Sequence, residues 1–211
     1  MLRITEIFHS IQGESTHAGR PCAFVRLTGC NLRCRWCDSE YTFTGGERRS
    51  IDDVVGQVKS FGCNLVEITG GEPLAQAESL DLIKRFCDDG FEVLIETSGS
   101  IDIAPVDARA TIILDIKCPG SGEVEKNRWE NLDHLKTRDE IKFVIAGRDD
   151  YDWSRRVIEE RGLNRWTVLF SPVWGEMNLQ SLAEWMLADR VPARLQTQLH
   201  KHIWGAEARG V

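Results

Sequence analysis

The sequence predicts an α/β fold: an incomplete TIM-like barrel of about six parallel strands with flanking helices. Along the 211 residues, short β-rich runs alternate with amphipathic helical stretches, and this alternation is typical of parallel strands joined by helical crossovers. Six or seven strands are too few for the eight of a closed barrel, so we expect an open one. An open doubly wound sheet is the alternative topology.

The predicted strands are short apolar runs that are rich in β-branched and aromatic residues. They cover residues 22–27, 65–69, 91–96, 111–116, 141–145, 166–170 and 195–199. A first helix is expected to begin at Ser50 and to stop at Gly62, because Ser is a favoured helix cap and Gly a favoured terminator. Further helices are predicted at residues 78–89, 152–161 and 179–188.

Composition narrows the class of protein. With 42% hydrophobic and 28% charged residues, the chain can form one substantial core, and we expect a single domain over residues 1–211. The net charge of -7 argues against a nucleic-acid partner, which requires an excess of Lys and Arg. No apolar run reaches the roughly 18 residues of a membrane span, and the charged N-terminus is unlike a signal peptide. We therefore expect a cytoplasmic protein without a membrane partner.

Three of the seven cysteines lie close together in the longest irregular stretch, residues 28–49. Cys30, Cys34 and Cys37 directly follow the first predicted strand, and active sites of α/β proteins gather at the carboxyl ends of their strands. Thiolates are the ligands of iron–sulfur clusters. Three thiolates on four irons would leave one iron open to a ligand. A structural zinc site completed by Cys22, Cys63 or His17 is the alternative, although zinc sites usually use paired Cys-x2-Cys knuckles.

Polar or glycine-rich segments also follow the later strands. They are Thr69-Gly70-Gly71-Glu72-Pro73, Glu96-Thr97-Ser98-Gly99, Asp115-Ile116-Lys117 and Phe170-Ser171-Pro172-Val173. Because parallel strands present their carboxyl ends at one edge, these segments are expected to surround the cysteine loop.

The Cys-x3-Cys-x2-Cys loop, with Trp36 before its last cysteine, and the Gly-Gly-Glu segment resemble the radical S-adenosylmethionine (SAM) superfamily. The resemblance implies a [4Fe-4S] cluster on the three cysteines, and S-adenosyl-L-methionine chelating its open iron. The Gly-Gly-Glu segment would bind the amino group of the cofactor. The cofactor-binding residues implied are Trp36, Asp38, Gly70, Gly71, Glu72, Glu96, Ser98, Asp115, Ile116, Lys117, Ser171, Pro172, Val173 and Trp174.

Within that superfamily the whole chain resembles the 7-carboxy-7-deazaguanine synthase family. The resemblance rests on Phe8-His9-Ser10-Ile11-Gln12-Gly13-Glu14, on the cysteine loop, and on Gln198-Leu199-His200-Lys201 near the C-terminus. It implies a lyase that converts 6-carboxy-5,6,7,8-tetrahydropterin to 7-carboxy-7-deazaguanine in 7-deazapurine (queuosine) biosynthesis, a tRNA modification pathway. The substrate-binding residues implied are Ile11, Gln12, Gly13, Glu14, Arg26, Thr69, His200, Lys201 and Val211.

The side chains suit such a substrate, because Arg26 can bind a carboxylate with two N–H groups, while Gln12 and Glu14 can pair with a pterin edge. The resemblance also implies that Ser39 ligates Mg²⁺. Two positions depart from the family pattern: Ser39 stands where many members have Thr, and Ser98 where many have Asn. The second departure weakens any expectation of an amide contact to the cofactor at position 98.

The reaction implied is abstraction of hydrogen from C6 by a 5′-deoxyadenosyl radical, followed by ring contraction and loss of ammonia. The chemistry would be carried by the cofactor, so no residue is assigned as an acid or base. A reductase such as flavodoxin or ferredoxin and a second copy of the chain are the partners expected.

Two other functions stay open. An activase that makes a glycyl radical in a partner protein would share the cysteine loop, and a non-catalytic zinc- or cluster-binding module would share only the cysteines. The segment Gln12-Gly13-Glu14 favours the pterin enzyme over both.

Overall fold

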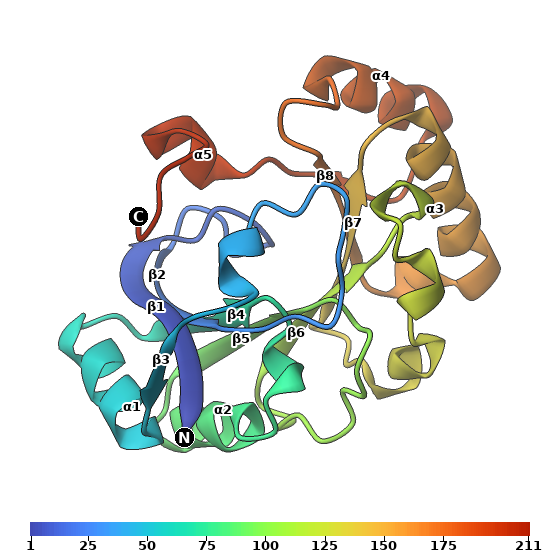
Figure 1. Ribbon diagram of the computed structural model, residues 1–211. Coiled ribbons are helices and arrows are strands. Elements are labelled where there is room, and N and C mark those ends of the chain that lie inside the picture. The colour runs from blue at the N-terminus through green and yellow to red at the C-terminus, as the bar shows by residue number, and fades with distance from the viewer.

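The computed structural model describes residues 1–211, whose strands form one nine-stranded sheet in the order β3-β1-β2-β4-β5-β6-β7-β8-β9 (Figure 1). The strands are β1 (Leu2–Ile11), β2 (Pro21–Leu27), β3 (Glu47–Arg49), β4 (Leu65–Gly70), β5 (Glu92–Thr97), β6 (Thr111–Ile116), β7 (Glu140–Ile145), β8 (Thr167–Pro172) and β9 (Arg194–Leu195). From β2 to β9 all neighbours are parallel. The outermost strands β3 and β9 do not pair, so the predicted open barrel with six long parallel strands is confirmed.

Four helices lie outside the curved sheet and the fifth lies near its open end, close to the C-terminus (Figure 1). The helices are α1 (Ile51–Ser60), α2 (Ser79–Asp88), α3 (Arg148–Arg161), α4 (Leu179–Asp189) and α5 (Leu199–Trp204). Short 3₁₀ turns lie at Glu40–Thr42, Pro73–Ala75, Pro119–Ser121, Val124–Lys126, Trp129–His134 and Leu163–Arg165. None of the helices combines the length and hydropathy required to span a bilayer.

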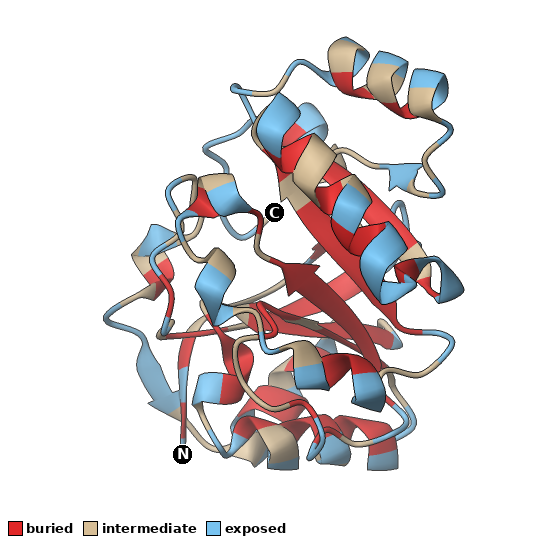
Figure 2. Ribbon diagram, turned by 90° about the vertical axis from the view of Figure 1, so that its right-hand side faces the viewer, coloured by how far each residue is buried: buried red, intermediate tan, exposed pale blue.

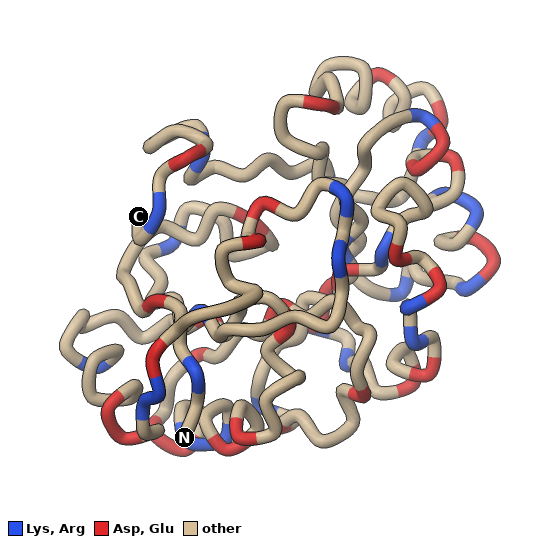
Figure 3. Tube along the Cα trace, in the orientation of Figure 1, with Lys and Arg blue, Asp and Glu red and all other residues tan.

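Helix α1 begins where the sequence predicted, and its first turn shows why. The Ser50 hydroxyl accepts a hydrogen bond from the Asp53 amide at 3.1 Å, and the Asp53 carboxylate accepts from the Ser50 amide at 3.4 Å. Two amides without a helical partner are thereby satisfied. Figure 3 shows Lys and Arg interspersed with Asp and Glu along α2 and α3, as in the pair Lys84–Asp88.

Successive side chains of each parallel strand point to opposite faces of the sheet. One set, with Val66 and Ile68 of β4, packs against the helices in a core of 37 buried residues (Figure 2). The other set fills the inside of the barrel. Five of these inward side chains, at the amino ends of the strands, form a separate apolar cluster: Cys22, Phe24, Leu65, Leu94 and Ile113. We call this cluster the barrel floor.

The structure adds two strands to those predicted. β1 pairs antiparallel with β2 and with β3, whereas the sequence analysis placed no strand before residue 22. The alternation of buried Leu2 and Ile4 with exposed Arg3 was a strand signal. β3 is only three residues long and exposed, so it has no apolar pattern and depends on pairing with β1.

The prediction of a strand at residues 195–199 was wrong. Only Arg194 and Leu195 pair with β8, and Leu199 begins helix α5. The remaining residues turn away because their polar groups bond to the loop after β1: the Ser15 amide donates to the Gln196 side chain at 2.8 Å. Helix α3 also starts four residues earlier than predicted, at Arg148.

We predict that Leu94→Ala lowers the free energy of unfolding by about 2–5 kcal/mol, because Leu94 is fully buried in the barrel floor and truncation leaves a cavity. Chemical denaturation measures the loss. The control is Leu187→Ala on α4, where the side chain is 79% exposed and a change within about 0.5 kcal/mol is expected. Equal effects of the two substitutions would contradict the role given to the floor.

Candidate active site

A cavity of about 630 Å³ opens above the barrel floor, at the carboxyl ends of the parallel strands. Its wall includes the cysteine loop, strand ends from β2 to β8, and the C-terminal residues from Gln198 onward. All site residues predicted from the sequence line this cavity except Glu72 and Ile116. The polar and glycine-rich segments that follow the separate strands therefore all line one cavity.

The cysteine loop is fixed at its base and along its length by backbone hydrogen bonds. Gly29 donates to the Thr42 carbonyl at 2.7 Å and accepts from the Glu72 amide at 2.9 Å, while Arg35 donates to the Ser121 carbonyl at 2.9 Å. The loop is thereby tied to its own far end, to the segment after β4 and to the segment after β6.

Cys30, Cys34 and Cys37 all line the cavity, and all three thiols are free and half-buried. No three His, Cys, Asp or Glu side chains converge closely enough to hold a single metal ion, as a zinc site requires. An iron–sulfur cluster takes its thiolates at separate irons, so spaced thiols fit it. Burial raises the pKa of Cys34 to about 11, and the neighbouring Lys117 opposes that rise.

Close packing against the end of β2 and the start of the cysteine loop requires glycine at positions 70 and 71. A Cβ on Gly71 would collide with the Gly29 carbonyl oxygen and lie 2.7 Å from the Cys30 Cβ. A Cβ on Gly70 would meet the backbone of Leu27 in the same way. The two glycines thus let β4 lie directly beneath the start of the cysteine loop, and both also line the cavity.

Glu72 and Ile116 lie outside the cavity wall. Glu72 is fully buried, and its carboxylate accepts hydrogen bonds from the Thr97 hydroxyl at 2.8 Å and from the Ser98 amide at 2.8 Å. This carboxylate joins the ends of β4 and β5, and its role as a ligand for the amino group of the cofactor stays a prediction. Ile116 belongs to the helix-facing core, because strand alternation turns its side chain away from that of Asp115.

On the expected cofactor side, one buried carboxylate oxygen accepts no hydrogen bond. Lys117 donates to Asp115 Oδ2 at 2.8 Å, whereas Asp115 Oδ1 is buried and has no hydrogen-bond partner. Ser98 and the segment from Ser171 to Trp174 line the same region. Buried polar atoms are normally paired, so Asp115 Oδ1 marks a place where a bound polar group fits.

The expected substrate side is built around the loop that follows β1. Gln12 is buried, its amide donates to the Glu67 carboxylate, and its carbonyl oxygen accepts from the Glu14 amide at 3.0 Å. Arg26 donates through Nε to Glu6 at 2.7 Å, and Tyr41 donates to the same oxygen at 2.9 Å.

The C-terminal segment covers this side. The Leu199 amide donates to the Gly13 carbonyl at 3.0 Å, and Gly13 has no side chain where His200 lies against it. Lys201 donates to Asp38 at 2.7 Å. Desolvation favours neutral Asp38, but Lys201 and the Gln198 amide outweigh it and lower the pKa of Asp38 to about 2. The terminal residue Val211 also lines the cavity.

Several charged or polar residues of the cavity were not predicted from the sequence, among them Glu6, Tyr41, Glu67 and Lys142. Glu67 is the only charged residue of β4, Leu65–Gly70, and Lys142 lies between the apolar residues Ile141 and Phe143 of β7. A single charge inside a strand was the available signal, because it must face either solvent or a polar interior. Glu6 and Tyr41 carried no such signal.

Comparison with known proteins assigns the class. The family described as Radical SAM superfamily matches residues 24–187, and the chain belongs to that superfamily, whose members bind an iron–sulfur cluster and S-adenosylmethionine. The chain is 46% identical to the 7-carboxy-7-deazaguanine synthase of Koribacter versatilis, covering 100% of both chains. It is also 46% identical to that of Chlorobaculum tepidum, covering 100% of this chain and 97% of the relative. It is a member of the 7-carboxy-7-deazaguanine synthase family of radical SAM lyases.

Solved structures agree on the fold. The crystal structure of QueE from Escherichia coli matches with a TM-score of 0.75 at 23% identity, covering 94% of each chain. Streptococcus suis SuiB, in its complex with the precursor peptide SuiA, matches with a TM-score of 0.56 at 15% identity, covering 81% of this chain and 46% of the other. The incomplete barrel is therefore shared beyond close relatives.

We predict that Glu67→Gln reduces the pH dependence of stability. Burial, followed by the charges of Glu96 and Glu14, raises the pKa of Glu67 from 4.5 to about 8. The folded protein therefore keeps a proton that the unfolded chain has released, and its free energy of unfolding falls between about pH 6 and pH 8, by at most about 1.4 kcal/mol per pH unit. The amide of the variant has no such proton, so the fall should be smaller.

Urea denaturation of both proteins at the two pH values measures this difference. Glu130→Gln is the matched control, because Glu130 is exposed and its loss should leave the wild-type slope unchanged. A Glu67→Gln protein whose stability falls as steeply as that of the wild type would show that Glu67 is ionised throughout.

Proposed function

We propose that this chain converts 6-carboxy-5,6,7,8-tetrahydropterin to 7-carboxy-7-deazaguanine with release of ammonia. One observation carries the proposal: the three free cysteines share a single cavity with Gln12, Glu14 and Arg26. The cavity volume of about 630 Å³ lies within the range of pockets that enclose small-molecule ligands.

Cys30, Cys34 and Cys37 would hold the cluster, and Asp115, Lys117 and Ser98 line the region expected for S-adenosylmethionine. When held by these cysteines, the cluster would supply the electron for reductive cleavage of S-adenosylmethionine, the source of the 5′-deoxyadenosyl radical. The protein has to hold the reactants and keep water away from the radical.

Arg26 suits the carboxylate of the substrate. Only its Nε is occupied, by Glu6 at 2.7 Å, and its two Nη groups have no hydrogen-bond partner in the chain. They form the planar fork that binds a carboxylate through two N–H groups. Phe8 lies 5.7 Å from the guanidinium carbon and limits how far the fork can turn.

Glu14 and Gln12 suit the N–H-rich edge of a pterin. The Glu14 carboxylate accepts from Lys142 at 3.1 Å and from Gln198 at 3.0 Å, and these contacts fix its direction. A carboxylate oxygen can accept more than one hydrogen bond, so Glu14 has capacity left for ring and amino N–H groups. The α5 segment, tied to Asp38 by Lys201, closes this side of the cavity.

We further propose that Ser39 ligates Mg²⁺ together with substrate oxygens. Ser39 lines the cavity, and its side chain makes no capping hydrogen bond to the following 3₁₀ turn. Its hydroxyl contacts only the Cys37 thiol, at 3.7 Å, so it keeps an oxygen lone pair for a metal ion. Mg²⁺ binds few protein oxygens and keeps several waters, which a single hydroxyl beside a substrate carboxylate would satisfy.

The remaining proposals follow from family membership. An acidic electron carrier of the flavodoxin or ferredoxin class supplies the electron, the chain acts in the cytoplasm as a homodimer, and its product enters queuosine synthesis for tRNA modification. Neither the activase nor the zinc-module alternative is favoured by the named relatives.

We predict that the anaerobically reconstituted enzyme, given reductant, S-adenosylmethionine, Mg²⁺ and the carboxypterin, forms 7-carboxy-7-deazaguanine. Cys34→Ala should lose at least about 10³-fold of this activity, because a cluster ligand is missing. Mass spectrometry of the products measures both. Cys87→Ala, on α2 and outside the cavity, is the control and should retain activity. Formation of 5′-deoxyadenosine without 7-carboxy-7-deazaguanine would refute the substrate, and zinc uptake without iron–sulfur absorbance would refute the enzyme.

We predict that Ser39→Ala raises the Mg²⁺ concentration needed for half-maximal product formation by about tenfold, the effect of removing one ligand worth roughly 1.4 kcal/mol. Ser39→Thr, which keeps the hydroxyl, should stay within about threefold of wild type. Titration of the reaction with Mg²⁺ measures both values. Identical Mg²⁺ dependence of Ser39→Ala and wild type would remove Ser39 from the metal site.

A further inference from the structure

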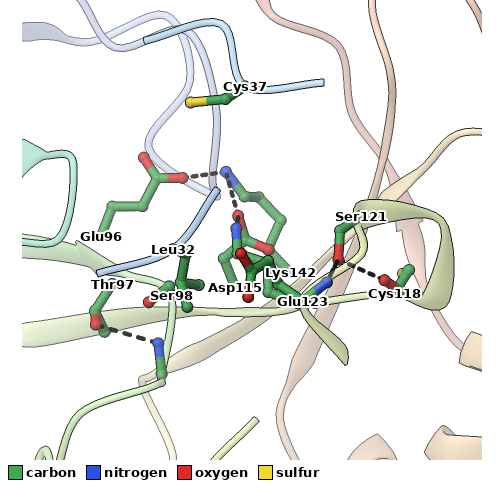
Figure 4. Close-up of polar contacts among 12 residues, drawn as sticks. Leu32, Cys37, Glu96, Thr97, Ser98, Asp115, Cys118, Ser121, Glu123 and Lys142 are labelled. Atoms are coloured by element: carbon green, nitrogen blue, oxygen red, sulfur yellow. Dashed lines mark hydrogen bonds and ion pairs between the residues drawn. The ribbon is translucent and has the colours of Figure 1, made fainter. Parts of the chain in front are cut away.

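A layer of four ionisable side chains lies directly above the apolar barrel floor. Glu67, Glu96, Asp115 and Lys142 come from the adjacent strands β4, β5, β6 and β7, and each lines the cavity. Asp115 and Lys142 are paired in the register of β6 and β7. We call these four residues the ionisable layer. Figure 4 shows Glu96 and Asp115 around Lys142.

Lys142 is the centre of this layer. Its residue is 5% exposed, and its ammonium forms ion pairs with Glu96, with Glu14 Oε2 at 3.1 Å and with Asp115 Oδ2 at 3.8 Å. Lys117 is the other lysine in contact with the layer, and it pairs with Asp115 at 2.8 Å. Glu14 and Glu96 therefore have Lys142 as their only ion-pair partner.

The contacts of Lys142 join two parts of the cavity that are far apart in the chain. Glu14 belongs to the loop after β1, on the expected substrate side. Glu96 and Asp115 belong to strands on the expected cofactor side. The remaining contacts of Glu14 come from the neutral amides of Gln196 and Gln198, at 3.3 and 3.0 Å, so only Lys142 supplies a compensating charge.

We propose that Lys142 is a positioning residue, which keeps Glu14 a correctly aimed carboxylate for the N–H groups of the substrate. The proposal rests on the proposed function and adds to it a residue outside the family motifs. Lys142 acts through Glu14, with its own ammonium held by three carboxylates. Loss of this charge leaves the partly buried carboxyl groups of Glu14 and Glu96 without a cation, and burial then favours their neutral forms.

The effect of removing the Lys142 ammonium should depend on pH, because other ionisable groups surround it. The ionisable groups near it are Glu14 from the β1 loop, Glu67, Glu96 and Asp115 from the strands, Lys117 just after β6, and Asp38 from the cysteine loop. His200 from α5 lies near Glu14. Burial raises the pKa of Glu96 even with Lys142 in place. Without the ammonium, the layer should take up protons at neutral pH and release them as the pH rises.

The test compares Lys142→Met and Lys142→Arg with wild type. Calorimetry on the reconstituted enzyme with S-adenosylmethionine bound gives the dissociation constant of the carboxypterin at about pH 6.5 and pH 8.5. Lys142→Met should weaken binding at least tenfold at the lower pH and recover several-fold at the higher pH, as the carboxyl groups ionise. Lys142→Arg keeps the charge and should stay within about threefold at both.

Lys84→Met is the matched control, because the Lys84 side chain is 62% exposed on α2 and its removal should change nothing. Circular dichroism checks folding, and Lys142→Gln takes the place of Lys142→Met if the latter does not fold.

Wild-type binding by Lys142→Met at both pH values, equal weakening by Lys142→Arg, or a loss that does not vary with pH would each overturn the proposal. If wild type binds the carboxypterin without converting it, the proposed reaction fails, while the binding comparison still decides the role of Lys142. If wild type does not bind the carboxypterin, both proposals fail.

Discussion

Parallel strands that alternate their side chains between two faces impose the constraint on which the rest of this molecule depends. The outer face must be apolar because the helices cover it, and the core of 37 residues satisfies that demand. The inner face has no helix to cover it. Five apolar residues close its amino end, and everything above them faces a cavity where polar groups can be paired or solvated.

The cavity is completed by chain segments that have little regular structure of their own. The cysteine loop is tied down by backbone bonds from Gly29 and Arg35, and the two glycines at the end of β4, Gly70 and Gly71, allow its close approach. On the opposite side, residues from Gln196 to Lys201 bond to the loop after β1 and to Asp38. Segments from both ends of the chain thus enclose one reaction space, which a radical reaction requires.

Local signals explain which parts of the fold and site could be predicted. Strands with continuous apolar runs and the capped helix at Ser50 were found because their patterns are local. The three-residue strand β3 could not be found, since its pairing with β1 is a long-range interaction. Residues 195–199 have strand-like composition, but hydrogen bonds to distant Gly13 and Ser15 decide their path. Sequence order also could not reveal that Thr97 and Ser98 donate hydrogen bonds to the Glu72 carboxylate.

By itself the sequence determined the chemistry available to this protein: three closely spaced thiols, a Gly-Gly-Glu turn and a Gln-Gly-Glu loop, recognisable because each is a short contiguous motif. Only the tertiary structure decided which side chains meet. It bonded the Glu72 carboxylate to Thr97 and Ser98, brought Lys142 against Glu14 across 128 positions of sequence, and placed the C-terminal helix beside the loop after β1. The physical reason is that burial and charge pairing depend on neighbours in space, which a contiguous motif does not contain.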